Sequence, residues 1–382
     1  MCKNVINKKK HILFVTSNAS LYGANTSMLN LMDKLNCDGY RTSVIVSTYG
    51  SLLQELNRRN YTYKVIPFFG NYNKVGKPIK AKEKFYNFFY NYELAEQSKD
   101  LIDNWSIDVI HSNSSVADFG PILAMLTHRP HIWHIREMME DDYDIEYTYP
   151  ILNKILRNKS RKIICITKAV KEKHYGNKVK KNVQVIYNGF DIDRYLIHKE
   201  EILNGDVCNF LICGVVQEGK GQIYAIKMIY LLIQKGLTKV HLYVVGNGDD
   251  DYIKKLKRYV RDRSIEDYVT FVAFTSNIQE IRKKIDIALV CSQNEALGRV
   301  TIESMLGDLL VIGANSGGTA EIVQDGKTGY LYKVGDETDL AQKVIYALSH
   351  KEEVKDIVRK AKIYAMENFN SIEQTKKIEK IY

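Results

Sequence analysis

The sequence has no apolar run long enough to cross a membrane. A spanning helix needs about 20 consecutive apolar residues, whereas runs such as FLICGVV (210–216) and DIALVC (286–291) have the length of a buried strand. The basic opening MCKNVINKKK leads only into the short apolar run HILFV (11–15), and no small-residue cleavage site follows it. A signal peptide is therefore not expected.

Cysteine pairs and the common nucleotide-binding and nucleic-acid-binding patterns are missing as well. The six cysteines show no CxxC spacing, and several lie in apolar, strand-like runs; they are Cys2, Cys37, Cys165, Cys208, Cys213 and Cys291. This distribution predicts reduced core residues in a cytoplasmic protein, not a metal framework. There is no GxGxxG or GxxxxGKS loop. Helix-turn-helix, zinc and RNP patterns are also missing, so the net charge of +10 does not by itself predict a nucleic-acid partner.

What the chain does have is an ordinary globular composition. Its 382 residues are 45% hydrophobic and 26% charged, which excludes disordered and fibrous classes and predicts two domains. The charge is unevenly spread between the halves. Residues 1–190 carry 28 basic and 17 acidic side chains, a net +11, whereas residues 191–382 carry 27 and 28, a net −1. The basic surplus therefore belongs to the first half.

Short runs rich in Ile and Val alternate with helix-period segments along the whole chain, as in parallel sheets covered by helices on both faces. The expected strands are 11–17, 42–48, 63–68, 108–114, 131–135, 162–167 and 183–188, then 209–216, 239–246, 268–274, 286–292 and 309–315. Each half is therefore expected to be a doubly wound α/β domain, joined at YNGFDIDRY (187–195). Ligands of such sheets bind beyond the C-terminal ends of the strands, so two facing domains would share a cleft.

Two loops that follow expected strands carry glycine at the start of a helix. In SNASLYGANTSMLNL (17–31), Gly23 would let backbone amides at a helix N-terminus approach an anion, although an ordinary turn needs the same glycine. In CGVVQEGKGQIYAIKMIYLL (213–232), Lys220 precedes Gly221 and would neutralise phosphate oxygens beside the helix amides. A solvated surface lysine is the alternative interpretation.

The strongest pattern is CSQNEALGRVTIESM (291–305). Glu295 lies in a loop with Gly298, and Glu303 lies one turn into a helix that begins about Arg299. The two carboxylates would be about 5–10 Å apart along the helix rise. Carboxylates accept hydrogen bonds from hydroxyls and free amides donate to phosphate, so the pattern suits a sugar nucleotide lying across a helix start. The alternative is an exposed loop glutamate and an unrelated surface glutamate.

These motifs follow one another in an order that resembles a known family. NEALGRVTIESM (294–305) matches the E-x7-E signature of the retaining family 4 glycosyltransferases, also called group 1. VIYNGFD (185–191) resembles their joint motif VxxNGxD, and GVVQEGKG (214–221) their phosphate loop GRLxxxKG. ANSGGTAEIVQDGKTGYLY (314–332) is similar to GGxxEIVxxGxTG, and ENFNSIEQTKKIEKIY (367–382) to the segment that returns to the first domain. The resemblance spans nearly the whole chain.

The resemblance implies the GT-B fold, with two Rossmann-like doubly wound domains facing across a cleft. Residues 1–188 would bind the acceptor, residues 189–360 the nucleotide sugar, and residues 361–382 would cross back as a helical segment. The implied reaction moves a sugar from a nucleotide sugar to an acceptor hydroxyl with retention, normally without a metal or other cofactor. A UDP-sugar is favoured over a GDP-sugar, and the acceptor would be a saccharide, lipid-linked or protein-linked, in surface polysaccharide or glycoconjugate synthesis.

The family's functional residues carry over position by position. Glu303 would bind the ribose hydroxyls, Glu295 the hydroxyls of the transferred sugar, and Lys220 the diphosphate. Further diphosphate contacts would come from amides near Leu297 and Gly298 and, from the first domain, near Gly23. Such contacts would stabilise the departing diphosphate most as the bond breaks.

The sequence departs from the family at two places. Val215 stands at the arginine position of GRLxxxKG, and we hypothesise that Arg299 supplies the lost cation. In PHIWHIRE (130–137), Arg136 stands where relatives often carry a histidine that contacts the transferred sugar, and His134 lies two residues earlier on the same strand face. Either side chain would take that role, although a satisfied strand histidine is the alternative for His134.

Two further segments of the first half are distinctive. KVGKPIKAKEKFYNFFYNY (74–92) mixes lysines with aromatics, which suits an anionic membrane surface. A solvated helix that packs its rings on the core is an equally good interpretation. With the +11 charge of this half, the stretch predicts peripheral binding at the inner face of the plasma membrane or an anionic acceptor. EMMEDDYDIEY (137–147) is expected to form a mobile acidic loop.

Two other functions remain open at this point. Val215 stands in place of the expected arginine and Arg136 in place of the expected histidine, which suggests a non-catalytic partner subunit as an alternative. Both signature glutamates are nevertheless present. A sugar-nucleotide epimerase or a phosphorylase would share the fold, and the E-x7-E pattern argues against both. The sequence leaves the donor sugar, the acceptor and the homo- or hetero-oligomeric state open.

Overall fold

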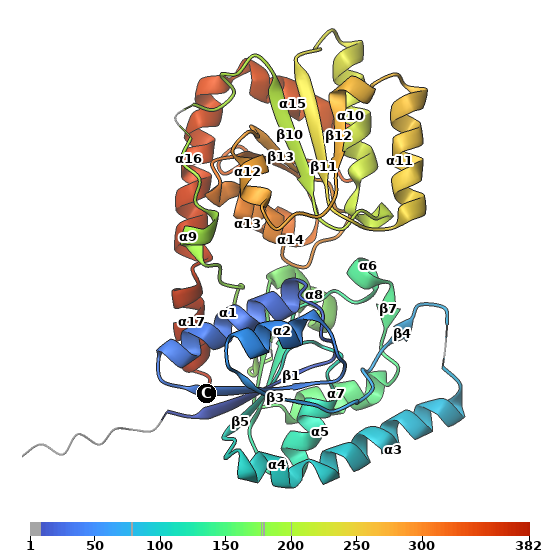
Figure 1. Cartoon of the computed structure of the whole chain (residues 1–382), viewed down its shortest axis with the longest axis vertical. Helices are drawn as coiled ribbons and strands as arrows, with labels where there is room; N and C mark the ends of the chain where they lie inside the picture. Colours follow the sequence, from blue (N-terminus) through green and yellow to red (C-terminus); the bar gives the residue numbers. More distant parts are fainter. Residues whose placement is uncertain (1–8, 78, 177, 179, 200) are drawn as a thin grey trace, which may run out of the picture. The chain divides into compact units, whose positions relative to one another are not determined.

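The computed structural model describes residues 9–77, 79–176, 178, 180–199 and 201–382 (Figure 1). Cys2, an expected core residue, lies outside this part of the chain. The chain divides into two compact units: unit 1 runs to Phe190 and includes Ser371–Tyr382, and unit 2 is Asp191–Asn370. The returning segment therefore begins at 371 where the sequence placed it at 361, because α16 (Lys351–Asn368) continues as one helix of unit 2.

Unit 1 is built on a seven-stranded sheet with the order β3-β2-β1-β5-β6-β8-β9. All neighbouring pairs in it are parallel. The strands are β1 (His11–Thr16), β2 (Arg41–Val46), β3 (Thr62–Val65), β5 (Val109–Ser112), β6 (His131–Ile135), β8 (Lys162–Cys165) and β9 (Val183–Val185). Every residue of β1, β5 and β6 is buried, as expected for strands covered on both faces.

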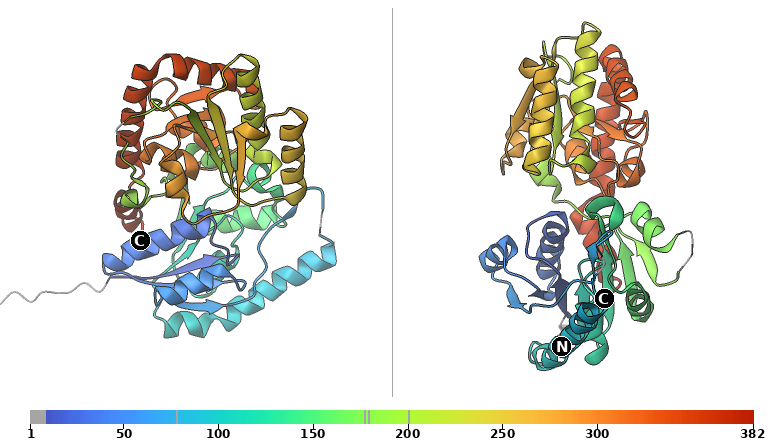
Figure 2. Two further views of the ribbon diagram at one scale, coloured as in Figure 1. Left: turned by 45° about the horizontal axis from the view of Figure 1, so that its top comes forward. Right: turned by 90° about the vertical axis from the view of Figure 1, so that its right-hand side faces the viewer.

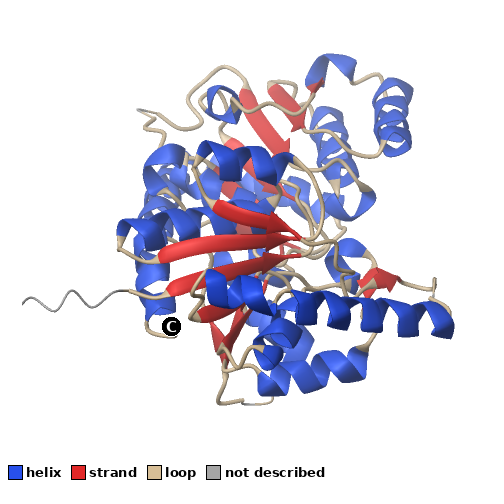
Figure 3. Ribbon diagram, turned by 60° about the horizontal axis from the view of Figure 1, so that its bottom comes forward, coloured by secondary structure: helices blue, strands red, loops and turns tan. Residues whose placement is uncertain are grey.

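Helices cover both faces of this sheet (Figures 2 and 3). They are α1 (Gly23–Cys37), α2 (Ser51–Arg58), α3 (Ala81–Gln97), α4 (Lys99–Asn104), α5 (Phe119–Leu126), α7 (Pro150–Lys159), α8 (Lys168–Tyr175) and α17 (Ser371–Glu379), with the short α6 (Glu140–Tyr143). The returning segment joins the core: Ile378, Ile381 and Tyr382 are buried in the same cluster as Ile12 and Phe14 of β1.

The acidic tract 137–147 differs from the expected loop. It forms α6 and the strand β7 (Ile145–Glu146), which pairs antiparallel with β4 (Asn73–Lys74). The Glu137 carboxylate is buried and accepts hydrogen bonds from the Ser114 hydroxyl at 2.7 Å and from the Ser115 amide. These contacts order the start of the tract, so the loop prediction is wrong here.

Unit 2 has a six-stranded parallel sheet with the order β12-β11-β10-β13-β14-β15. Its strands are β10 (Cys208–Cys213), β11 (Val240–Val245), β12 (Val269–Val272), β13 (Ile287–Val290), β14 (Leu310–Ala314) and β15 (Tyr330–Tyr332). Its helices are α9 (Ile192–Tyr195), α10 (Gln222–Gln234), α11 (Asp250–Asp262), α12 (Ile278–Arg282), α13 (Arg299–Leu306), α14 (Gly317–Ile322), α15 (Glu337–Ser349) and α16, with 3-10 turns η1 (Glu218–Lys220) and η2 (Glu266–Tyr268).

The cysteines and the helix lengths test two of the expectations from the sequence. Cys165, Cys208 and Cys291 are buried free thiols, and burial raises the pKa of Cys165 and of Cys291 to about 12. Cys37, however, is exposed at the end of α1, so the core prediction is wrong for this residue. No helix in the described ranges is both long and apolar enough to span a bilayer.

Candidate functional site

The loops that follow β10 and β13 bring Lys220 and Glu295 together in unit 2. Lys220 ends η1, and its Nζ lies 2.8 Å from Oε2 of Glu295. Both side chains are partly exposed, at 28% and 21%. The sequence placed these two residues on one ligand, and the fold makes them an ion pair that solvent can reach.

Backbone contacts hold the two loops against each other. The Gln293 amide donates to the Gly219 carbonyl at 3.0 Å. Gly221 has a positive φ of +71°, and a Cβ there would lie 2.2 Å from the Cys291 carbonyl oxygen. Only glycine fits this close approach, which fixes Lys220 beside the end of β13.

The turn after β14 supports the Glu295 loop from the other side. The Ser316 hydroxyl donates to the Gln293 carbonyl at 2.5 Å, and the Gly318 amide donates to the Glu295 carbonyl at 2.6 Å. A Cβ at Gly318 would lie 2.7 Å from the Leu297 Cα. The SGG part of the motif 314–332 thus positions the carboxylate loop.

Helix starts in unit 2 fall into two kinds. Asp249 and Asp336 cap α11 and α15 with their side chains. By contrast, α10 and α13 begin after Gly221 and Gly298, both left-handed, with no side-chain cap. Just before α13, the side chain of Leu297 is apolar and buried, so the polar groups at this position are those of the backbone. The N-cap residue Gly298 therefore brings no side chain to the first turn of α13, and a helix start of this kind suits an anion.

Glu303 lies on α13 between two guanidinium groups. Arg282 Nη2 is 2.5 Å from Oε2, and Arg299 Nη2 is 3.3 Å from Oε1 and also 3.3 Å from the Tyr195 hydroxyl. Arg282 is only 1% exposed. Burial disfavours its charge, but Glu303 and the Cys213 sulfur outweigh burial and raise the pKa of Arg282. Arg282 was not predicted, because at the end of a charged helix segment it looks like any surface arginine.

In unit 1, Gly23 begins α1, which also has no side-chain cap. Asn25 fixes this helix start: its Nδ2 donates to the Ser20 carbonyl at 2.7 Å, and its Oδ1 accepts from the Thr16 hydroxyl at 2.8 Å and from Asn113 Nδ2 at 3.2 Å. The amides at Gly23 are therefore held at the C-terminal end of β1, as the sequence predicts.

Arg136 follows β6 and links this region to the joint motif. Its Nε donates to Asn113 Oδ1 at 2.7 Å, and its Nη1 donates to Asn188 Oδ1. Arg136 is 5% exposed, and Asn188 is the asparagine of the NGFD motif. The guanidinium is thus held in one orientation by side chains that follow two other strands, β5 and β9.

His134 lies in the interior of the sheet and takes part in a hydrogen-bonded chain. Its Nδ1 is 3.2 Å from Arg136 Nη2 and 3.2 Å from His111 Nε2, and His111 Nδ1 is 2.7 Å from the Tyr382 hydroxyl. Arginine only donates, so His134 Nδ1 accepts, His111 donates through Nε2, and Tyr382 donates to His111. Burial, and then the charge of Arg136, hold the pKa of both histidines well below its ordinary value.

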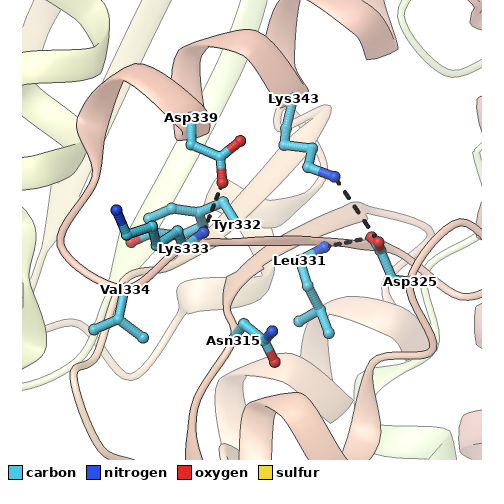
Figure 4. Close-up of a pocket in the computed structure, with 8 residues that line it drawn as sticks. All are labelled: Asn315, Asp325, Leu331, Tyr332, Lys333, Val334, Asp339 and Lys343. Carbon is cyan, nitrogen blue, oxygen red and sulfur yellow. Dashed lines mark hydrogen bonds and ion pairs between the residues drawn. The ribbon is translucent and has the colours of Figure 1, made fainter.

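A cavity of about 490 Å³ in unit 2 lies apart from these residues (Figure 4). Asp339 accepts a hydrogen bond from the Lys333 amide at 2.7 Å, and Asp325 accepts one from the Leu331 amide at 2.8 Å. The two carboxylates therefore cap an amide of the edge strand β15 and the amide of the residue that follows it. None of the predicted site residues lines this cavity. Within the described ranges, no three His, Cys, Asp or Glu side chains cluster as a metal site requires.

Comparison with known proteins agrees with this geometry. The family model Glycosyltransferase Family 4 matches residues 22–194, and Glycosyl transferases group 1 matches residues 193–364. N-acetyl-alpha-D-glucosaminyl L-malate synthase of Bacillus anthracis is 25% identical over 306 residues, which are 77% of this chain and 79% of that protein.

Solved structures show the same fold. HepE of Anabaena in complex with UDP aligns with a TM-score of 0.81 at 20% identity, over 97% of this chain and 98% of that one. A glycosyltransferase from Rickettsia africae aligns with a TM-score of 0.80 at 20% identity, over 98% of both chains. The chain therefore belongs to the family 4 glycosyltransferases of group 1 and has their GT-B fold.

Proposed function

We propose that the protein is a retaining glycosyltransferase that needs no metal and takes its sugar from a UDP-sugar. The acceptor is a hydroxyl of a saccharide, lipid-linked or protein-linked, in surface polysaccharide or glycoconjugate synthesis. In the reaction, the bond between the anomeric carbon and the diphosphate breaks, a bond to the acceptor oxygen forms on the same face of the sugar, and the proton of the acceptor hydroxyl passes to the departing diphosphate.

The observation that carries the proposal is the Lys220–Glu295 ion pair next to the uncapped start of α13. A nucleotide sugar offers both partners a replacement. The diphosphate takes Lys220 and the amides near Leu297 and Gly298, and the sugar hydroxyls donate to Glu295. The ion pair thus keeps both side chains oriented until the donor binds and replaces the contact between them.

Bond cleavage leaves an extra negative charge on the diphosphate. Lys220 and the amides at Gly298 interact more strongly with that charge than with the intact donor, so they lower the barrier and not only the dissociation constant. Glu303 binds the ribose hydroxyls, and its ion pairs with Arg282 and Arg299 hold the carboxylate in place.

The choice of donor and acceptor rests on relatives. HepE has been crystallised with UDP, with UDP and glucose, and with UDP-glucose. One relative, 24% identical over 59% of this chain, is the capsular polysaccharide glycosyltransferase CapH of Staphylococcus aureus. These names support a UDP-sugar and a surface polymer without naming the sugar transferred here.

In unit 1 we assign Arg136, rather than His134, to the position where relatives contact the transferred sugar. His134 has no exposed surface, whereas Arg136 lies at the end of β6 beside Asn113. Gly23 contributes helix amides to the diphosphate. We keep Arg299 as the replacement for the cation missing at Val215, with the Glu303 contact orienting it. An Arg299→Ala variant with full affinity for UDP contradicts that role.

Thermal denaturation with nucleotides tests the proposal. A nucleotide that binds only the folded state stabilises it by about 2.7 kcal/mol at 100 times its Kd, which is a Tm increase of roughly 5–10 °C for a unit of this size. We expect UDP to produce this shift with EDTA present, and GDP to produce less. NMR of the product formed from a UDP-sugar checks retention. No shift with any nucleoside diphosphate, or an inverted product, contradicts the proposal.

A further inference from the structure

Helix α3 exposes aromatic rings on the side where a surface helix normally carries charge. Phe85, Phe89 and Tyr92 follow the i, i+4, i+7 spacing of one helix face, and all are exposed, Phe85 at 67%. Tyr86 adds a fourth exposed ring. No residue from 81 to 90 is buried, so these rings are not the outer edge of a packed core.

Lysines precede this apolar stripe along the chain, whereas Glu93 and Glu96 follow it. Between residues 74 and 84 the chain carries five lysines and one acid, Glu83. Lys80 and Lys82 are exposed and Lys84 is half-buried, and they lie at the start of the helix just before the rings. The stripe therefore combines exposed aromatic area with a local positive charge.

A second helix continues the same character next to α3. The Tyr149 hydroxyl donates to the Lys84 carbonyl, and the Tyr149 ring lies 6.4 Å from that of Phe88, so the start of α7 adjoins α3. On α7, Ile151 and Ile155 are 76% and 50% exposed. The exposed residues between and beyond them include Lys154 and Lys159, and α7 contains no acidic residue.

We propose that the α3–α7 face docks on an anionic lipid bilayer. The face is defined by Phe85, Tyr86, Phe89, Tyr92, Ile151 and Ile155, with Lys80, Lys82, Lys84, Lys154 and Lys159. A bilayer interface receives the rings and isoleucines at the boundary of the head groups, and anionic head groups neutralise the lysines.

The charge of the face argues for a bilayer over a second copy of the chain. A two-fold interface places the same patch on both sides, so the lysines of one copy would meet those of the other. An apolar partner would leave them without counter-charge. Lysines at the edge of an apolar patch extend their stems along it and keep the ammonium at the head groups.

Co-sedimentation of the full chain with vesicles tests the docking. We expect binding to phosphatidylcholine vesicles that contain about 30% phosphatidylglycerol at about 0.1 M salt, and loss of binding at about 0.5 M salt. Each lysine near an anionic surface contributes about fivefold to the partition constant. Changing Lys80, Lys82 and Lys84 together to Gln is therefore expected to weaken binding about 100-fold.

The apolar part is tested separately. Phe85→Ser with Phe89→Ser is expected to abolish sedimentation with vesicles while leaving UDP binding and the Tm unchanged, because both rings are exposed. Phe89→Trp is expected to lose fluorescence to brominated lipids in anionic vesicles. These readouts do not involve the donor or acceptor, so they stand or fall separately from the proposed reaction.

Matched controls come from exposed residues of unit 2. Changing Lys254, Lys255 and Lys257 of α11 to Gln, or Ile363 and Met366 of α16 to Ser, removes the same charge or exposed apolar side chains elsewhere. The proposal fails if these controls bind as weakly as the α3 variants. It also fails if neutral vesicles bind equally well, or if the chain is a dimer in solution that Phe85→Ser with Phe89→Ser dissociates.

Discussion

The two units hold their strand-end polar groups in different ways. In unit 2, opposite charges from separate elements pair directly: Lys220 with Glu295 between two loops, and Arg282 with Glu303 between α12 and α13. In unit 1, the three hydrogen bonds described for Arg136 go to acceptors without charge, on Asn113, Asn188 and His134.

The difference teaches what each arrangement is suited to do. A partly exposed ion pair is worth little by itself, so a charged ligand displaces it at low cost. A buried chain of neutral acceptors fixes the direction of each donor and resists rearrangement. We therefore expect unit 2 to exchange partners when the donor binds, and unit 1 to keep one geometry throughout.

The largest effect is expected at the Lys220–Glu295 pair. Lys220→Ala removes a cation that stabilises the leaving diphosphate, so kcat of sugar transfer is expected to fall roughly 10²–10³-fold. Steady-state kinetics with a UDP-sugar measures this. Lys227 forms a comparable pair with Glu337, 3.0 Å apart and similarly exposed, on α10. Lys227→Ala is the matched control and is expected to keep kcat within about twofold; equal losses in both variants would remove the distinction.

The next effect concerns stability at Glu303. Glu303→Ala leaves the buried Arg282 guanidinium without its carboxylate, so the free energy of unfolding is expected to fall by about 3 kcal/mol. Arg282→Met combined with Glu303→Leu removes both charges and is expected to recover most of that loss, as followed by urea denaturation.

The same double variant distinguishes a structural role of Glu303 from a role in binding UDP. It is expected to be folded but unable to bind UDP tightly, because no carboxylate remains for the ribose hydroxyls. Isothermal titration with UDP checks this. Tight binding by the folded double variant would show that Glu303 only supports the helix.

Acidification is expected to distinguish the two units by lowering the stability of unit 1. Burial lowers the pKa of His131 and of His174 to about 3 and that of His111 and His134 in the same direction, all in unit 1. Below pH 6.5 the unfolded state then binds more protons than the folded one, so stability falls as pH falls, by about 1.4 kcal/mol per group and pH unit.

One group in unit 1 works in the opposite direction. Burial raises the pKa of Asp118 to about 7, so its folded form binds a proton first and gains stability as pH falls below 7. The net loss from pH 7 to 5.5 is expected to be roughly 3–4 kcal/mol. Trp105 and Trp133 both lie in unit 1, so urea denaturation followed by tryptophan fluorescence reports this unit. An unchanged midpoint at pH 5.5 would contradict the expected instability.

The sequence predicted the fold and the unit 2 loops in detail because both follow from local patterns. Runs of Ile and Val located twelve of the strands within a few residues, and the E-x7-E spacing located Glu295 and Glu303. The missed strands are the two-residue β4 and β7 and the three-residue β15, which are too short for a period to emerge. Lys220 and Glu295 were placed on one ligand, but their direct pairing depends on the packing of Gly221 against β13.

Local sequence patterns could not predict the hydrogen-bond network of unit 1. Arg136 and His134 were candidates for one role, with a satisfied strand histidine as the alternative for His134, and the local sequence did not decide between these interpretations; in the structure His134 is fully buried. Its partner His111 lies 23 residues away on another strand, and Tyr382, which donates to His111, lies 271 residues from His111 on the returning segment. The same holds for Arg282, which is buried beside residues distant in sequence such as Glu303 of α13.

The smallest effect is expected from Tyr382→Phe. The variant keeps the buried ring but removes the donor to His111 Nδ1, so the free energy of unfolding is expected to fall by about 1 kcal/mol. Tyr92→Phe, whose hydroxyl makes an exposed 3.3 Å contact with Glu96, is the matched control and is expected to change nothing measurable. Since Asn113 and Asn188 still hold Arg136, kcat of Tyr382→Phe is expected to stay within about twofold. A much larger fall in kcat with normal stability would show that the chain from Tyr382 through His111 and His134 orients Arg136, and that unit 1 depends on its network as strongly as unit 2 depends on its charges.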